Sequence, residues 1–238
     1  MASQFDFVYF DLDDTLLDHR VAERSALAAL HTELGGVEEL TFDLETLQRE
    51  YHDSNVELWR QYSLAEITGD QLRHDRFAII VKRHGLMIDA LDLSDRYMEL
   101  YSRFWVPVEG ALDAFRRIAD STSVGIITNG FAATQREKLN RFRDLRDRSS
   151  TIVISEEFGH MKPSPKLFAY ALSQAGCAAE NVLYVGDSWH SDVEGGLASG
   201  WNVAWYTPDA TKAVGTDVAR DRLFAFDAWS DLVRFCTG

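Results

Sequence analysis

Residues 7–16 read Phe-Val-Tyr-Phe-Asp-Leu-Asp-Asp-Thr-Leu. The first four form an apolar, aromatic and β-branched run, which is typical of a strand buried on both faces in a parallel sheet. The run stops at acidic residues, of which Asp11 and Asp13 lie two positions apart. If the chain is still extended there, both side chains project to the same side.

Two carboxylates placed that close repel each other, and a divalent cation would make the arrangement tolerable. Mg²⁺ prefers hard oxygen ligands, usually one or two carboxylates completed by water and substrate phosphate. The carboxyl end of a strand in an open parallel sheet is also where such folds bind ligands. The stretch therefore predicts a metal-dependent site, and the alternative is an acidic loop that caps the next helix.

The composition describes an ordinary globular protein that does not bind nucleic acid. The chain has 238 residues, enough for one large domain or a core with a modest insertion, and 46% of them are hydrophobic. Its net charge of −14 argues against binding a nucleic acid polymer, because phosphate backbones are bound by clustered Lys and Arg. A small anionic substrate stays compatible, since a metal and a few local donors can outweigh distant surface charge.

The cysteines and the hydropathy pattern indicate a cytoplasmic protein. Cys177 and Cys236 are far apart and form no C-x-x-C pair, so we expect no disulfide framework. The sequence has neither a signal-peptide pattern at its start nor a long apolar run, so we expect no membrane partner. The oligomeric state is left open.

After Leu17 the apolar residues recur at helical spacing in four blocks, which predicts four amphipathic helices. The four stripes are Leu27, Leu30 and Leu34; then Leu44, Leu47, Tyr51, Leu58 and Tyr62; then Leu72, Phe77, Ile80 and Val81; and finally Tyr97, Leu100, Tyr101 and Phe104. We predict that residues 18–105 form a helical domain inserted into a core domain made of residues 1–17 and 106–238.

From Gly110 onward, apolar runs alternate with helical patterns. We expect strands at 124–127, 152–154, 182–185 and 203–206, helices at 111–119, 134–142, 166–175 and 192–198, and a short last strand and helix within 223–235. This alternation predicts parallel βαβ units and an α/β fold with a doubly wound parallel sheet. Residues 207–222 have no clear period and are expected to form a surface connection.

Each expected strand of the core is followed by polar residues. Residues 128–130 read Thr-Asn-Gly ahead of a helix, where they can hold an anion. Lys162 follows the third strand and can pair with a phosphate or with Asp11, and Asp187 and Asp192 follow the fourth as further metal-ligand candidates. Each has an ordinary alternative: a turn, a solvated lysine, and a helix cap.

The order of these groups resembles the four-motif pattern of the haloacid dehalogenase-like (HAD) hydrolase superfamily. The match runs across the core, and the insertion resembles the C1 cap of subfamily I. The resemblance implies a HAD-like Rossmannoid core with an inserted helical-bundle cap. Within this superfamily, the chain looks most like the bacterial pyrimidine 5′-nucleotidase branch, on residues 125–131, 153–157, 162–163, 167–172, 58–62 and 72–77.

The resemblance implies a two-step mechanism built on the first motif. Asp11 would be the nucleophile that attacks phosphorus and forms an aspartyl-phosphate. Asp13 would protonate the leaving oxygen and then activate water as a general base, and Thr15 would support the turn that sets these acids. Lys162 would offset charge on both the phosphate and Asp11.

The same resemblance implies the remaining ligands. Thr128 and the backbone amides of Asn129 and Gly130 would bind the phosphate together with Lys162. The cofactor would be Mg²⁺, with Mn²⁺ as an alternative. The metal ligands would be the Asp11 carboxylate, the Asp13 backbone carbonyl and Asp187, with Asp192 behind them.

We therefore expect a Mg²⁺-dependent phosphomonoesterase for a small phosphorylated metabolite, most specifically a pyrimidine nucleoside 5′-monophosphate. The alternatives are a phosphatase for a sugar phosphate or phosphoglycolate, a phosphomutase, and a catalytically silent HAD-like binding protein. A haloacid dehalogenase lacks the second aspartate of the first motif and uses no metal, so Asp13 and Thr15 favour phosphoryl transfer.

Four residues are candidates for contact with the substrate's base. Asn55, Trp59 and Tyr62 lie in the insertion, and Phe131 follows the anion turn, so an aromatic wall for a pyrimidine ring is conceivable. The alternative is that Trp59 and Tyr62 only pack within the cap at helical spacing.

Overall fold

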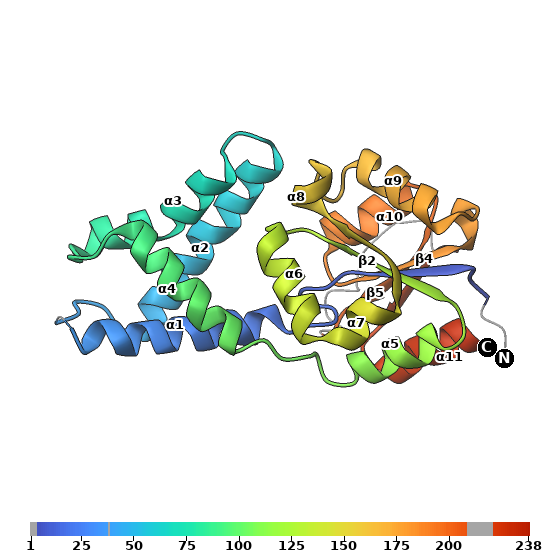
Figure 1. The fold of residues 1–238 in the computed structure, drawn as a ribbon, viewed down its shortest axis with the longest axis horizontal. Coiled ribbons are helices and arrows are strands. Elements are labelled where there is room, and N and C mark those ends of the chain that lie inside the picture. The colour runs from blue at the N-terminus through green and yellow to red at the C-terminus, as the bar shows by residue number, and fades with distance from the viewer. Residues whose placement is uncertain (1–3, 38, 209–220) are drawn as a thin grey trace. The chain divides into compact units, whose positions relative to one another are not determined.

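The chain folds into two compact units. The computed structural model describes residues 4–37, 39–208 and 221–238 (Figure 1). One unit, here called the sheet unit, comprises Met1–Asp18 and Pro107–Gly238, and the other, the helical unit, comprises His19–Val106. Each unit has its own apolar core.

The sheet unit is built on a six-stranded sheet in the order β3-β2-β1-β4-β5-β6, with every neighbouring pair parallel. The strands are β1 Phe7–Phe10, β2 Ser123–Thr128, β3 Ser149–Ile154, β4 Val182–Gly186, β5 Asn202–Tyr206 and β6 Leu223–Phe226. The predicted parallel, doubly wound α/β sheet is confirmed. The strand order reverses between β1 and β4, and folds of this type bind ligands at that point.

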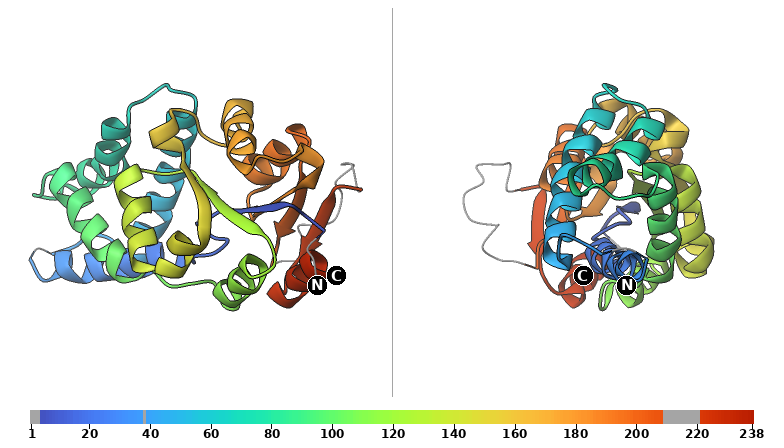
Figure 2. Two further views of the ribbon diagram at one scale, coloured as in Figure 1. Left: turned by 45° about the vertical axis from the view of Figure 1, so that its right-hand side comes forward. Right: turned by 90° about the vertical axis from the view of Figure 1, so that its left-hand side faces the viewer.

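Strand β1 is apolar on both sides because both faces of the sheet are covered. Val8 and Phe10 point to one face and pack with α5 (Ala111–Ala119) and α11 (Trp229–Thr237). Phe7 and Tyr9 point to the other face and pack with α9 (Pro165–Ala175) and the buried indole of Trp201. Figures 1 and 2 show α5 and α11 side by side, with α9 across the sheet from them.

The register places the carboxyl ends of the central strands together. Phe10 is paired with Ile126 of β2 and with Val185 of β4. The next residue, Asp11, continues the ladder, since its backbone N–H donates to the Val185 carbonyl over 2.8 Å. Polar residues that directly follow β1, β2 and β4 therefore meet at one edge of the sheet.

Shorter helical segments complete the sheet unit. They are α6 Ala132–Arg141, α7 Arg143–Arg148, α8 Ser155–Phe158, a 3₁₀ turn at Ala179–Asn181, a π-helical turn at Trp189–Glu194 and α10 Gly195–Ala198. The expected helix at 192–198 is thus two short segments. Most of the expected surface connection at 207–222 lies outside the described residues.

The described residues of the helical unit form four helices, as the apolar stripes predict. They are α1 His19–Gly35, α2 Leu44–Ser63, α3 Gly69–His84 and α4 Ala90–Arg103. Thr68 is the N-cap residue of α3 and forms a reciprocal capping box with Gln71. The apolar pattern is interrupted at this point because polar residues are needed to start the helix. Among the described helices, none is long and apolar enough to cross a membrane.

Candidate active site

The turn after β1 holds the acidic motif in one shape. The backbone N–H groups of Leu16 and Leu17 both donate to the Leu12 carbonyl, and that of Asp14 donates to Leu17 over 2.7 Å. Asp14 has φ of 58°, a left-handed conformation that aspartate tolerates better than most residues. Leu12 and Leu16 are fully buried, so the turn is anchored by its apolar members while the acidic ones reach the sheet edge.

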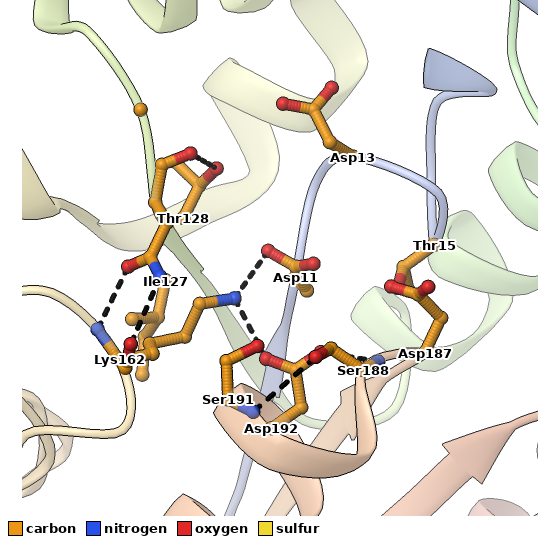
Figure 3. A network of polar contacts seen from close by, with 12 residues as sticks. Asp11, Asp13, Thr15, Ile127, Thr128, Lys162, Asp187, Ser188, Ser191 and Asp192 are labelled. Atoms are coloured by element: carbon orange, nitrogen blue, oxygen red, sulfur yellow. Dashed lines mark hydrogen bonds and ion pairs between the residues drawn. The ribbon is translucent and has the colours of Figure 1, made fainter. Parts of the chain in front are cut away.

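Lys162 occupies the centre of a buried polar cluster behind Asp11. Its Nζ donates to Asp11 Oδ1 over 2.6 Å, to Asp192 Oδ1 over 2.8 Å and to the Tyr184 hydroxyl over 2.9 Å. Figure 3 shows the Lys162 side chain reaching between Asp11 and Asp192. Lys162 is only 3% exposed, so these three side chains and not bulk water solvate its ammonium.

The backbone of Lys162 is fixed by Asn129. Asn129 Oδ1 accepts from the Lys162 N–H over 2.8 Å, and its Nδ2 donates to the Lys162 carbonyl over 3.1 Å. The residue expected to bind phosphate through its backbone therefore also ties the lysine loop to the end of β2.

Asp192 is an internal anchor for the lysine. It is wholly buried; its Oδ1 accepts from Lys162 and Tyr184, and its Oδ2 accepts from the Ser188 N–H over 3.0 Å. The π-helical turn and Gly186 make this possible, because a Cβ on Gly186 would lie 2.4 Å from Asp192 Oδ2. Asp192 therefore holds Lys162 from inside the protein, and its role behind the metal ligands stays a prediction.

Three carboxylates gather at this edge of the sheet. Asp11, Asp187 and Asp192 each offer an oxygen, and these oxygens lie within 4.8 Å of one another. Thr15 supports the group, since its hydroxyl donates to Asp187 Oδ1 over 3.4 Å. With Lys162 as the ammonium in contact with Asp11 and Asp192, the group carries more negative than positive charge.

The electrostatics of this group favour a bound cation. Burial raises the pKa of Asp11 well above its ordinary value, opposed by the Lys162 ammonium and assisted by the carboxylates of Asp192 and Asp187. Burial by itself lowers the pKa of Lys162, but Asp11 and Asp192 more than compensate and raise it. When all three carboxyls are ionised they outnumber the one ammonium by two charges, and a bound divalent ion with oxygen ligands would favour that ionised form.

Two polar groups of the anion turn at the end of β2 form hydrogen bonds with other side chains of the protein. Thr128 is fully buried and its hydroxyl accepts from Gln135 Nε2 over 2.8 Å. The Gly130 N–H donates to the Ser155 hydroxyl over 3.1 Å, so that amide already has a partner within the protein. The turn is therefore braced by α6 and by the start of α8.

Asp13 lies apart from the carboxylate cluster, and Figure 3 shows its carboxylate directed away from Asp11. Lys138 Nζ donates to both of its oxygens, over 2.7 and 2.9 Å, and Gln135 Nε2 donates to Oδ2 over 2.9 Å. Neither residue was singled out from the sequence. The available signal was their three-residue spacing on one helix face directly after the anion turn.

The residues proposed to contact the base fall into both units. In the helical unit, Trp59 and Tyr62 form an edge-to-face ring pair with centroids 5.7 Å apart, and both are half-buried. Asn55 is buried in the same helix, and its Oδ1 has no hydrogen-bond partner among the described residues. Phe131 belongs to the sheet unit and is only 5% exposed.

The site combines carboxylates at strand ends with a buried lysine, and it lies at the switch point of the sheet. Comparison with known proteins identifies the family that this arrangement indicates. The model of the haloacid dehalogenase-like hydrolase family matches residues 5–200. The chain belongs to the haloacid dehalogenase-like hydrolases. The resemblance inferred from the four motifs is confirmed, and this HAD hydrolase is an enzyme of that family.

Two curated relatives of this HAD hydrolase are named as nucleotidases. It is 35% identical over 203 residues to the pyrimidine 5′-nucleotidase YjjG of Escherichia coli, covering 85% of this chain and 86% of that protein. It is 30% identical over 207 residues to the pyrimidine 5′-nucleotidase PynA of Streptococcus pneumoniae, covering 86% and 84%.

A solved structure of the family shares the fold over nearly the whole length. The HAD-hydrolase YfnB of Bacillus subtilis, crystallised with magnesium, matches with a TM-score of 0.79 and 26% identity, covering 98% of this chain and 99% of that one. The magnesium belongs to that protein's structure, and the acidic cluster of this HAD hydrolase has the charge and ligand type to hold such an ion.

Proposed function

We propose that this enzyme is a Mg²⁺-dependent phosphomonoesterase that acts through an aspartyl-phosphate, with pyrimidine nucleoside 5′-monophosphates as its substrates. The observation that carries the proposal is the contact of a buried lysine with Asp11 at the switch point of the sheet, beside the further carboxylates of Asp187 and Asp192. The two nucleotidase relatives support the substrate class.

The residues divide the chemistry between them. The Asp11 carboxylate attacks phosphorus, and Lys162 offsets negative charge on both reacting partners. Asp13 gives a proton to the leaving oxygen and then accepts one from the water that hydrolyses the aspartyl-phosphate. The Asp11 and Asp187 carboxylates and the Asp13 backbone carbonyl would hold Mg²⁺, which when bound neutralises charge on the phosphate.

The helical unit serves as the cap in this proposal. Trp59 and Tyr62 provide the aromatic surface on which a pyrimidine ring would stack, an interaction worth about 1–3 kcal/mol per base. Phe131 is too buried in the sheet unit to offer a comparable open ring face.

Phosphate release tests the chemistry. The panel is dUMP, UMP, dTMP, AMP, a hexose phosphate, phosphoglycolate and p-nitrophenyl phosphate, each with Mg²⁺ and with EDTA. Asp11→Asn is compared with Asp113→Asn, which changes an exposed carboxyl that pairs with Arg116 on the surface. Release that needs metal and is lost only in Asp11→Asn supports the mechanism; release that persists in Asp11→Asn or in EDTA contradicts it.

The same panel tests the substrate. A preference for pyrimidine monophosphates supports the nucleotidase proposal, whereas a preference for a sugar phosphate keeps the chemistry and overturns the substrate. Trp59→Ala should then lower activity on dUMP relative to the hexose phosphate, and Val56→Ala, an exposed site on the same helix, should not. An unchanged ratio in Trp59→Ala would show that the ring does not contact the base.

A further inference from the structure

Two buried side chains of α6 hold the Asp13 carboxylate. Lys138 contacts both oxygens, over 2.7 and 2.9 Å, and Gln135 contacts Oδ2 over 2.9 Å. Gln135 and Lys138 are each 2% exposed, whereas the Asp13 side chain is 25% exposed. The donors are therefore part of the rigid interior, and the acid that they hold reaches out of it.

The amide of Gln135 can be oriented in only one way. Its Nε2 lies within hydrogen-bond distance of Asp13 Oδ2, the Thr128 hydroxyl and the Asn129 carbonyl. Turning the amide over would place its oxygen against a carboxylate and a carbonyl, neither of which can donate. In the observed orientation Oε1 is buried and has no partner among the described residues. The orientation that lets Nε2 donate to Asp13 therefore leaves Oε1 buried without a hydrogen bond in the described part of the chain.

The surroundings leave little room for any other arrangement. A Cβ on Gly130 would lie 2.6 Å from Gln135 Nε2, so the amide packs directly against the backbone of the anion turn. The same amide thereby links the phosphate-binding turn to the acid of the first motif.

Charge neutralisation alone does not account for Lys138. Asp13 is exposed enough for water to solvate it, so it does not need a buried ammonium as a partner. Lys138 is the buried member, and burying an ammonium costs desolvation free energy that even a good ion pair does not always recover. What the pair achieves is a fixed location for one carboxylate.

We propose that Lys138 and Gln135 are positioning residues that fix the Asp13 carboxyl where it meets the leaving oxygen of the substrate. This inference rests on the proposed function. As the ester O–P bond breaks, its electron pair goes to the leaving oxygen, which takes the proton of Asp13. The resulting carboxylate later takes a proton from the water that displaces Asp11 from phosphorus.

The test compares two leaving groups. The alkoxide of dUMP needs a proton as it leaves, whereas p-nitrophenolate leaves readily without one. The measured quantity is kcat/KM, because it reports only the steps up to phosphoryl transfer to Asp11, before Asp13 acts as the base. Lys138→Met removes the ammonium and keeps the length of the side chain, and Lys138→Arg restores a cation.

We expect Lys138→Met to lose about 10- to 100-fold in kcat/KM on dUMP and less than about threefold on p-nitrophenyl phosphate. Lys138→Arg should recover most of the loss. Arg136→Met is the matched control on the same helix, since Arg136 pairs with Glu157 at the surface, and it should behave as wild type on both substrates. Gln135→Met provides a second variant if Lys138→Met does not fold, and it should show the same selective loss.

The alternative outcomes are distinct. Equal losses on both substrates, or no loss on either, would overturn the positioning role while leaving the phosphatase proposal intact. If the wild-type enzyme hydrolyses neither of these compounds nor any other phosphate ester of the panel above, both the proposed function and this inference are overturned.

Discussion

Replacing Lys162 with Met should destabilise the sheet unit strongly, apart from any effect on catalysis. The ammonium is 3% exposed and contacts two carboxylates, Asp11 at 2.6 Å and Asp192 at 2.8 Å. Met keeps the volume of the side chain and removes the charge, so both carboxylates lose their cation in a site that water hardly reaches. Asp192 is wholly buried and keeps only its neutral donors.

The expected size of the effect follows from burial. Removing one partner of a buried ion pair typically costs about 3–5 kcal/mol, because the other charge is left uncompensated. In a protein of about this length, 1 kcal/mol shifts the melting temperature by about 2–4 °C, so the expected fall is about 6–20 °C. Thermal unfolding followed by circular dichroism at neutral pH in EDTA measures it without a contribution from bound metal.

A second variant separates lost charge from lost packing. Adding Asp192→Asn to Lys162→Met removes one of the two uncompensated carboxylates, so the double variant should melt above the single one although it carries more changes. The reasoning is refuted if Lys162→Met melts within about 2 °C of wild type. It is also refuted if the double variant is less stable than Lys162→Met, because the loss would then not come from unpaired charge.

Two further predictions concern stability elsewhere in the chain. Burial raises the pKa of Glu23, but hydrogen bonds and charge from two histidines outweigh it and hold that pKa below its ordinary value. Its stabilisation is therefore present above the ordinary glutamate pKa of about 4.3 and disappears as the pH falls through the lowered value. Glu23→Gln should melt below wild type at pH 6 and converge with it at pH 3; a constant gap would contradict this. Gly186→Ala should lower stability by about 1–3 kcal/mol in denaturant titration, since its Cβ would overlap Asp192, whereas Gly35→Ala meets only an ordinary contact and should be neutral. Equal stability of the two alanine variants would argue against that packing constraint.

The central strands were predictable because burial on both faces leaves a continuous apolar run. The expected strand at 7–10 coincides with β1, and the expected strand at 182–185 lies within β4. Segment α7 was not expected because Leu145 is its one buried residue, so it has no apolar periodicity to detect. Segment α8 is a single turn and too short to show a period at all.

The site was predictable only where it follows a strand. Asp11 and Asp187 are placed by the ends of β1 and β4, so parallel pairing is enough to bring them together. Lys138 and Gln135 lie within a helix, where polar residues ordinarily face water. Their three-residue spacing places them on one helix face, but only the packing of α6 against the sheet edge decides that this face meets Asp13.

The two ends of the helical insertion leave the sheet unit at nearly the same point. Leu17 forms an antiparallel bridge with Pro107, and the Val108 N–H donates to the Leu16 carbonyl over 3.0 Å. The 88 residues of His19–Val106 are therefore inserted between two chain segments that are hydrogen-bonded to each other, here called the neck. The sheet unit connects to this insertion as two strands of a hairpin connect to their loop. Because the entropy of closing a loop grows only slowly with its length, exchanging one insert for another should disturb the β1 turn very little. Under the proposed function, exchanging the insertion at these two ends would change the residues offered to the substrate while Asp11, Lys162 and Asp187 keep their places.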